Sequence, residues 1–486
     1  MGLFQSEALL NNYYRASVSD VLEYLLPACH FTDEELQEIA RKTDALISQA
    51  RQSMKLENPF YGMMVKYNLL TEEGVRLMTL LEALLRIPDR HTALLLIKEK
   101  IKGVRWKQSI NKGNMWLAKL SGHGLSFLEK ILHAHDKKGL KKIFARGSMP
   151  LVYIVLEQMM DKFSNQFVMA ETIKGAIKKS KTSSNKKYYF SYDMLGEAAR
   201  TLPMAQSYYQ AYDHALDALI SQARRESSFE NPGISIKLSA LHPRYEYTKI
   251  PLMQEVLYPK LFQLAKKAKE GGLNITIDAE EADRLTLSLA LIERLLSEKE
   301  FRGWNGFGMA LQAYQKRAFI LIEWLAALAE KNNQRIAVRL VKGAYWDSEI
   351  KQSQQGGYED YPVFTRKSLT DISYLACARL LLSKRGVLYP QFATHNGYTV
   401  MAILQICGEQ KALNFNGFMA WEARSMSFFW HRTPVRCLVA FTRRLVRIPI
   451  FFRTLCGVCS KMGRIVLSFL RCLIPKHLLQ HLPKVH

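Results

Sequence analysis

The nine residues 339–347, read as RLVKGAYWD, combine two cations, a glycine and two aromatic side chains directly after the apolar run 336–338. A buried strand with a purely structural role would not require two cations beside two aromatic residues at its end. In a parallel α/β barrel the loops that follow the strands converge on the face where ligands bind. This stretch therefore indicates a binding site, although by itself it also fits a basic, solvated loop.

Polar residues of catalytic type follow five other predicted strands as well. One such residue is readily explained as part of a barrel rim, but six sets in series favour a functional site. The five sets are Asp193 with Glu197; Lys237; Asp278; Gln312; and Thr394 with His395 and Asn396.

The residue types argue against metal-dependent hydrolysis, so no metal site is expected. His395 is the only histidine that closes a predicted strand, and no second histidine lies at ligand spacing from it. Arg339, Lys342 and Gln312, together with the aromatics, suit a large planar anionic cofactor. Arg339 is placed to stabilise negative charge on a ring system, and Lys342 and His395 are suited to phosphate.

From residue 188 onward, short apolar segments alternate with helical ones. Repeated strand–helix units predict a parallel sheet, and this many in series predict a (β/α)8 TIM-type barrel. An open doubly wound sheet is the competing fold, but no glycine-rich dinucleotide fingerprint follows any strand. We expect strands at 188–194, 234–238, 275–277, 308–311, 336–340 and 387–393, and helices at 205–224, 251–270, 282–296, 315–331 and 365–382.

Residues 1–180 are expected to form a helical arm and an all-helical domain. Residues 32–35, Thr-Asp-Glu-Glu, are typical of a helix start because acids favour the first turn. A second start is expected at 70–74. The segment 174–187 is rich in Lys and Ser and is expected to be a linker to the barrel, which spans 188–412.

With 486 residues, 48% of them apolar, the chain is expected to be globular and to hold more than one unit. It shows no signal peptide and no membrane span, so a cytoplasmic protein is expected. The net charge of +24 suggests nucleic acid or an anionic membrane as a partner. No base-reading motif is present, however, and residues 414–486 supply +11 of that charge through 12 Lys and Arg against Glu422.

Six long motifs closely resemble the proline dehydrogenase barrel of the bifunctional proline utilization A family, which joins that activity to glutamate semialdehyde dehydrogenase. FSYDMLGEAA (190–199) matches the start of the barrel in the same family. The six are GISIKLSALHPRY (233–245), IDAEEADRL (277–285), LQAYQKR (311–317), RLVKGAYWDSEIK (339–351), YPVFTRKSLTDISYLACA (361–378) and YPQFATHN (389–396).

The resemblance implies an FAD flavoenzyme that oxidises L-proline to Δ1-pyrroline-5-carboxylate by hydride transfer to flavin N5. Electrons would pass to a membrane quinone, which implies transient, peripheral contact with the inner membrane. Lys237, Asp278 and Tyr345 would face the substrate, and Glu197 would form part of a gate above it. The residues implied to hold FAD are Asp278, Gln312, Arg339, Lys342, Gly343, Ala344, Tyr345, Trp346, Thr394, His395 and Asn396.

Three departures from the family are expected. The amino-terminal ribbon–helix–helix DNA-binding segment of some members is not apparent, so no DNA partner is expected. The aldehyde dehydrogenase half is missing, so the chain is expected to be a truncated product. The barrel is expected to be incomplete at its last two strands, because residues 413–486 do not continue the family's sequence.

Residues 413–486 have the features of a shifted reading frame. When NFNGFMAWE (414–422) is reverse-translated one base earlier, the permitted products include Glu-Phe-Gln-Arg-Phe-His-Gly-Met-Gly, nearly the family motif. The same shift in LCGVCSKMGRIVLSF (455–469) restores an Arg-Arg pair and Asn-Gly-Ala-Asn-Ser. A one-base shift at or just before Leu413 explains both. The rival interpretation is a basic amphipathic membrane anchor.

In the family, the Arg-Arg pair binds the proline carboxylate through charge-assisted hydrogen bonds. Its loss predicts little or no proline oxidation by this chain. A six-stranded remnant would also have unpaired edges, which makes correct folding doubtful. The alternatives to a proline dehydrogenase are therefore an inactive remnant and a basic membrane- or nucleic-acid-binding protein.

Overall fold

The computed structural model describes residues 10–57, 172–183, 188–408, 414–418 and 436–444, together with a few isolated positions. Two compact units are distinguished along the chain. The first comprises Met1–Leu46 with Val168–Leu445, and the second comprises Ile47–Phe167 with Val446–His486. The barrel belongs to the first unit. The helix start expected at 70–74 lies outside the described residues.

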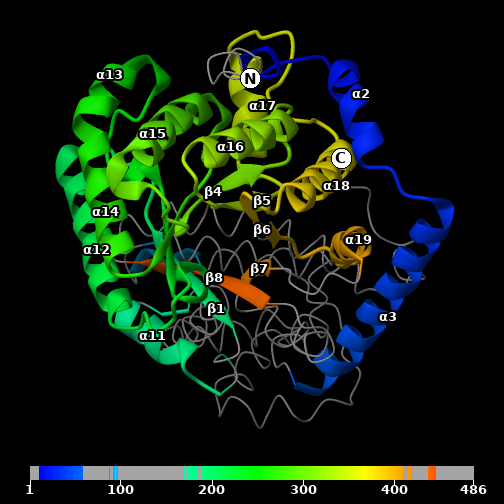
Figure 1. Ribbon diagram of the computed structural model, residues 1–486, viewed down its shortest axis with the longest axis horizontal. Coiled ribbons are helices and arrows are strands. Elements are labelled where there is room, and N and C mark those ends of the chain that lie inside the picture. The colour runs from blue at the N-terminus through cyan, green and yellow to red at the C-terminus, as the bar shows by residue number, and fades with distance from the viewer. Residues whose placement is uncertain are drawn as a thin grey trace. The chain divides into compact units, whose positions relative to one another are not determined.

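Eight parallel strands form a closed barrel in sequence order (Figure 1). Each strand pairs with the next along the chain, and β8 pairs with β1. The TIM-type barrel is thus confirmed, and the six expected strands lie within two residues of those observed. The strands are β1 (Tyr189–Leu195), β2 (Gly233–Ile236), β3 (Asn274–Ile277), β4 (Phe307–Gln312), β5 (Ile336–Val341), β6 (Leu388–Ala393), β7 (Asn414–Phe418) and β8 (Arg436–Arg444).

The sequence suggested that the places of the last two strands would be empty, but the structure fills them. Tail segments occupy them, with β7 paired to β6 and to β8. The edges expected of a six-stranded remnant are therefore paired, because backbone N–H and C=O groups pair whatever side chains the tail carries. Six strand–helix units are described in full, whereas the seventh and eighth are described by their strands alone.

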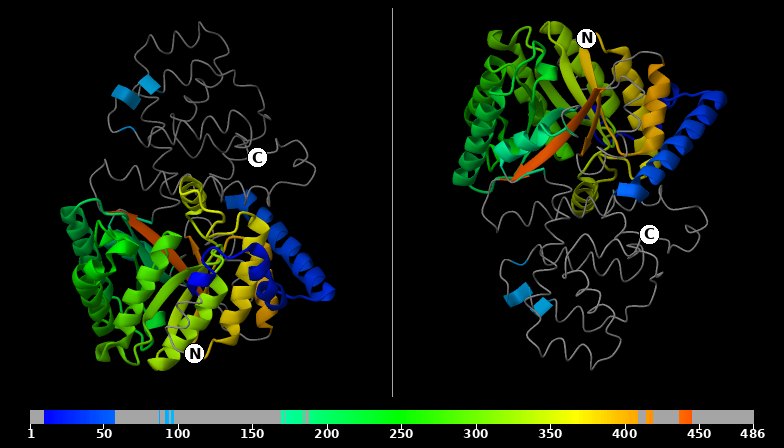
Figure 2. Two further views of the ribbon diagram at one scale, coloured as in Figure 1. Left: turned by 90° about the horizontal axis from the view of Figure 1, so that it is seen from above. Right: turned by 90° about the horizontal axis from the view of Figure 1, so that it is seen from below.

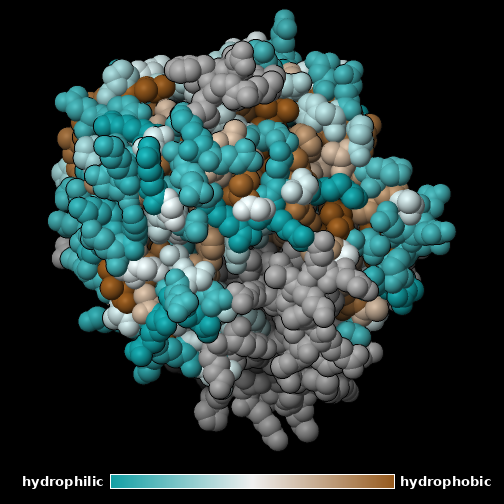
Figure 3. Space-filling view, in the orientation of Figure 1, coloured by the Kyte–Doolittle hydropathy of each residue, from teal (hydrophilic) through white to brown (hydrophobic). Residues whose placement is uncertain are grey.

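Helices cover the outside of the ring (Figures 1 and 2). In α14 the residues at helical spacing, Leu261, Leu264, Ala265 and Ala268, are buried, while the opposite face carries charge. Figure 3 shows hydrophilic side chains gathered over this side of the barrel. The helices are α12 (Leu202–Ile220), α13 (Ile250–Leu252), α14 (Tyr258–Glu270), α15 (Leu285–Ser297), α16 (Ala318–Lys331), α17 (Trp346–Gln355), α18 (Lys367–Ser383) and α19 (Gly397–Cys407).

Two helices near the amino terminus confirm its helical character in the described part. In α2 (Val18–Ala28), Val21 and Leu25 pack in one apolar cluster with Phe364 and Ala376. The expected start at 32–35 is a capping box at the head of α3 (Asp33–Glu57). The Glu35 N–H donates to Thr32 Oγ1 at 3.2 Å, and the Thr32 N–H donates to Glu35 Oε2 at 2.9 Å.

The expected linker 174–187 is partly a helix, α11 (Ile173–Ser180). Thr172 caps it by accepting the Gly175 N–H, and Ile173, Ala176 and Ile177 are buried at helical spacing. The high lysine content predicted a solvated linker, but three small or apolar residues at helical spacing are enough to bury one face of a short helix. Among the described residues, no helix is both long enough and apolar enough to span a membrane.

Candidate active site

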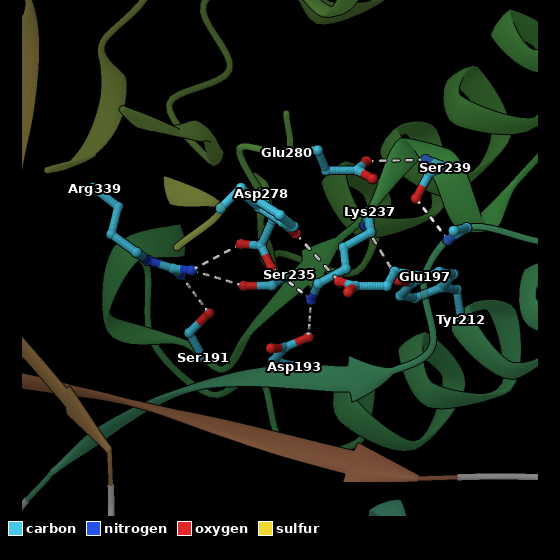
Figure 4. A network of polar contacts seen from close by, with 12 residues as sticks. Ser191, Asp193, Glu197, Tyr212, Ser235, Lys237, Ser239, Asp278, Glu280 and Arg339 are labelled. Atoms are coloured by element: carbon cyan, nitrogen blue, oxygen red, sulfur yellow. Dashed lines mark hydrogen bonds and ion pairs between the residues drawn. The ribbon is translucent and has the colours of Figure 1, made fainter. Parts of the chain in front are cut away.

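A mostly buried ion network, whose three charged side chains are 12–19% exposed, lies at the carboxyl ends of the first three strands (Figure 4). Lys237 directly follows β2, Asp278 directly follows β3, and Asp193 is near the end of β1. Lys237 Nζ donates to Asp193 Oδ1 at 2.8 Å and to Asp278 Oδ2 at 2.9 Å. Parallel strands end at the same edge of a sheet, so the chain brings these distant residues together.

Arg339, in β5, joins the network from across the barrel. Its guanidinium donates to Ser235 Oγ at 2.8 Å, to Ser191 Oγ at 2.9 Å and to Asp278 Oδ1 at 3.2 Å. The arginine is only 6% exposed. Three acceptors from three elements fix the orientation of a planar, permanently charged group.

The charges in this network compensate one another. Burial raises the pKa of Asp193 to about 6, although Lys237 lowers it and Asp278 raises it further. Burial opposes the charge on Lys237, but the two carboxylates outweigh it and hold the pKa of the lysine well above its usual value. The ammonium is therefore kept at neutral pH, and two carboxylates face two cations.

The loop after β5 departs from ordinary backbone at Gly343, whose φ is +131°. A Cβ at this position would lie 2.4 Å from the Tyr314 ring. Glycine is therefore required here for both conformation and space. Ala344 is exposed beside it, and Trp346, the first residue of α17, is 37% exposed. The loop offers an open, small-residue surface next to an aromatic face.

Lys342 is held at the edge of this surface by α18. It forms an ion pair with Asp371, which also pairs with Lys367 at 2.7 Å. Burial lowers the pKa of Lys342, and Asp371 opposes that shift. One carboxylate shared by two ammonium groups leaves net positive charge, which suits a phosphate.

Glu197, in the loop after β1, and Tyr345, in the loop after β5, are in contact. The Tyr345 hydroxyl donates to Glu197 Oε2 at 3.3 Å. Burial raises the pKa of Tyr345 well above its usual value, so the phenol stays protonated and remains a donor. The structure therefore brings these two residues, which lie 148 positions apart, into contact.

The remaining expected residues lie at the ends of β4 and β6. Gln312 is 3% exposed, and its Oε1 accepts from Gln315 Nε2 at 2.7 Å. Asn396 caps α19 by accepting the Thr399 N–H at 3.0 Å, and Thr394 Oγ1 accepts the Asn396 N–H at 3.1 Å. His395 is partly exposed between them.

The analysis of the sequence missed three partners of the expected residues. Ser191 and Ser235 orient Arg339, and Asp371 holds Lys342. A signal for the serines was present, because each precedes a strand-end charge by two residues and so faces the same side of its strand. Asp371 had no such signal, since it lies inside a helix.

The residues present fit a flat, anionic cofactor better than a metal. A fixed guanidinium, an open glycine–alanine surface, an exposed indole and a net positive lysine pair all lie at the mouth of one barrel. Within the part of the chain that the structure describes, no group of three or more His, Cys, Asp or Glu is arranged to hold a metal ion.

These features define a parallel α/β barrel with a polar site at its strand ends, and the comparison with protein families gives its class. The family model of proline dehydrogenase matches residues 176–421. This chain belongs to the proline dehydrogenase family. A second model, the DNA-binding domain of proline dehydrogenase, matches residues 60–167. This match runs against the expectation that no DNA partner exists, although nearly all of those residues lie outside the described ones.

The chain is similar to the bifunctional protein PutA of Escherichia coli K12, with 40% identity over 411 residues, which is 83% of this chain and 31% of the relative. PutA of Rhizobium meliloti is 38% identical over 82% of this chain and 32% of its own length. A crystal structure of proline utilization A from Bradyrhizobium japonicum matches with a TM-score of 0.66 and 34% identity, covering 92% of this chain and 45% of that one. The chain thus spans about a third of the curated relatives it matches.

Proposed function

We propose that this chain carries an FAD site at the mouth of the barrel and that the site oxidises L-proline to Δ1-pyrroline-5-carboxylate, with a membrane quinone as the final electron acceptor. The observation that carries the proposal is the buried Lys237–Asp193–Asp278 network with Arg339 beside it. Membership in the proline dehydrogenase family and the similarity to proline utilization A support L-proline as the substrate.

FAD would supply the hydride acceptor. Arg339 presents a fixed positive charge that stabilises negative charge on a neighbouring ring, because its three acceptors prevent it from turning away. Lys342 and His395 would meet phosphate, and Trp346 offers a face for stacking. The remaining residues proposed to hold FAD are Asp278, Gln312, Gly343, Ala344, Tyr345, Thr394 and Asn396.

Lys237, Asp278, Tyr345 and Glu197 would form the substrate side. Proline presents an ammonium, a carboxylate and an apolar ring. A protonated lysine fits the carboxylate, and the carboxylate of Asp278 fits the ammonium. The Tyr345–Glu197 contact would cover the site and exclude water while the hydride leaves the ring.

A second candidate is a non-catalytic remnant, which the composition of residues 413–486 favours. If those residues are out of frame, the chain lacks the arginine pair that the family uses for the carboxylate. We further propose the division into a helical region (1–180), the first six strands of the barrel with their helices (188–412) and an aberrant tail (413–486), which supplies the last two strands. We also propose a cytoplasmic location with transient contact at the inner membrane.

One experiment separates these proposals. The purified chain is examined anaerobically for a bound flavin spectrum and is then mixed with L-proline. Bleaching of the flavin supports proline oxidation. A flavin that stays oxidised supports cofactor binding without a working carboxylate site, and absence of flavin favours the remnant. A Lys342→Met variant serves as a control, because it should retain less flavin if the absorbance reports this site.

A further inference from the structure

The loop between β1 and α12, which carries Glu197, has an unusual backbone. Gly196 has φ +141°, and Ala198 has φ +50° in the left-handed region. A side chain at Gly196 would lie 2.5 Å from the Tyr208 ring, so the loop passes close over α12. An alanine in the left-handed region is disfavoured by about 1–2 kcal/mol. Contacts within the fold must hold this loop in place.

Ser239 supplies those contacts. The Ala198 N–H donates to Ser239 Oγ at 2.8 Å, and the Ala199 N–H donates to the Ser239 carbonyl oxygen at 2.9 Å. Ser239 is 2% exposed and lies in the 3₁₀ turn Leu238–Ala240, immediately after Lys237. The loop that bears Glu197 is therefore tied to the turn that bears the proposed substrate lysine.

Glu280 fixes this turn in its place. Its Oε1 accepts the Ser239 N–H at 3.0 Å (Figure 4). Its Oε2 accepts from Arg284 at 3.1 Å. Glu280 is 7% exposed and follows Asp278 by two residues. A buried carboxylate that accepts from both sides is a rigid anchor, because moving it would leave polar groups unpaired.

We propose that Ser239 and Glu280 are positioning residues, which hold the 196–199 loop so that the Glu197 carboxylate stays within reach of the Tyr345 hydroxyl. The chain of contacts runs from Glu280 through Ser239 and Ala198 to Glu197 and ends 3.3 Å from Tyr345. Neither anchor is among the residues proposed to contact L-proline or FAD. The inference rests on the proposed function only in taking L-proline as the ligand that Tyr345 and Glu197 face.

The test is amide hydrogen exchange in the intact chain, which does not depend on turnover. We expect the Ala198 and Ala199 amides to be protected in the natural chain. In Ser239→Ala they should exchange about tenfold faster, because one hydrogen bond is lost and the loop is loosened. Glu280→Ala should accelerate the same amides, whereas Glu280→Gln keeps an acceptor for the Ser239 N–H and should restore protection.

Ser373→Ala is the matched control, because Ser373 is also buried, at 1% exposure, and lies in α18 away from the loop. Unchanged exchange at Ala198 in Ser239→Ala overturns the inference. In a second measurement, Ser239→Ala should raise KM for L-proline several-fold while kcat falls less, with Ser373→Ala unchanged. Equal losses in both serine variants would indicate general destabilisation and overturn the positioning role. If the natural chain does not oxidise proline, the proposed function fails while the exchange comparison still stands.

Discussion

Replacing Lys237 by methionine should destabilise the barrel strongly at neutral pH. Methionine keeps most of the side-chain volume but removes the cation between Asp193 and Asp278, each within 2.9 Å of Nζ. Breaking a buried ion pair by removing one partner costs about 3–5 kcal/mol. The two carboxylates remain 19% and 16% exposed and would face each other, with only Arg339 left as a compensating cation.

The raised pKa of Asp193 makes the stability of the barrel depend on pH. Its value in the fold, about 6, lies above the ordinary 3.8. A shift of about two units is worth roughly 3 kcal/mol at pH values above the folded value. Because the folded state binds the proton more tightly, stability falls as pH rises from about 4 to about 6 in the natural chain. Loss of Lys237 raises the pKa of Asp193 further and extends this fall above pH 6.

The assay is thermal unfolding of the natural chain and of Lys237→Met between pH 5 and 8. A loss of about 3 kcal/mol corresponds to a drop in Tm of about 6–12 °C for a barrel of this size. The drop should be largest at pH 8 and shrink toward pH 5. The double variant Asp193→Asn with Lys237→Met should recover much of the loss, because it removes one of the stranded charges. Two results would refute the idea that Lys237 compensates the charges of Asp193 and Asp278. One is a Tm difference that does not change with pH, and the other is a double variant whose Tm is no higher than that of Lys237→Met.

Three further predictions follow from the site and from the tail. Gly343→Ala should lower flavin retention and cost about 2 kcal/mol or more, because the added Cβ meets the Tyr314 ring at a φ of +131°; the flavin-to-protein absorbance ratio and a melting curve test this, and an unaltered ratio would contradict it. Arg15→Ala should lower Tm by only a few degrees, because it removes a hydrogen bond to the Asp360 carbonyl at 2.9 Å and a contact 3.8 Å above the Tyr358 ring; a change beyond 10 °C would show that more depends on this arginine. If residues 413–486 are out of frame, as the second candidate function holds, the coding nucleotide sequence should contain a single insertion or deletion at or just before Leu413 that restores both hidden motifs, and the chain should oxidise proline slowly or not at all; full-rate turnover, or the absence of any such restoring change, would contradict the shifted frame.

The sequence by itself determined the barrel and most of the site. Apolar strands that end in polar residues have one stable arrangement, a parallel sheet whose strand ends meet, so Lys237, Asp278 and Arg339 could be placed together without coordinates. The long motifs around the same residues indicated the family, and the family model confirmed it. The capping box at Thr32 was likewise readable, because its partners are three residues apart.

Only the tertiary structure decided which polar and charged side chains pair with one another in the site. Ser191, Ser235 and Asp371 lie far from their partners along the chain. The alternation of the strands placed the two serines on the same side as Asp193 and Lys237, but only the fold shows that they hold Arg339 and that Asp371 holds Lys342. The tie from Glu280 through Ser239 to the Glu197 loop likewise joins three separate elements.

The closure of the ring by tail strands depended on backbone hydrogen bonding, which any residue except proline can donate. Side-chain patterns, which are what a sequence displays, determine where strands and charges occur. The pairing of backbones and the neutralisation of buried charge depend on what the fold brings near, and for that reason they were decided in three dimensions.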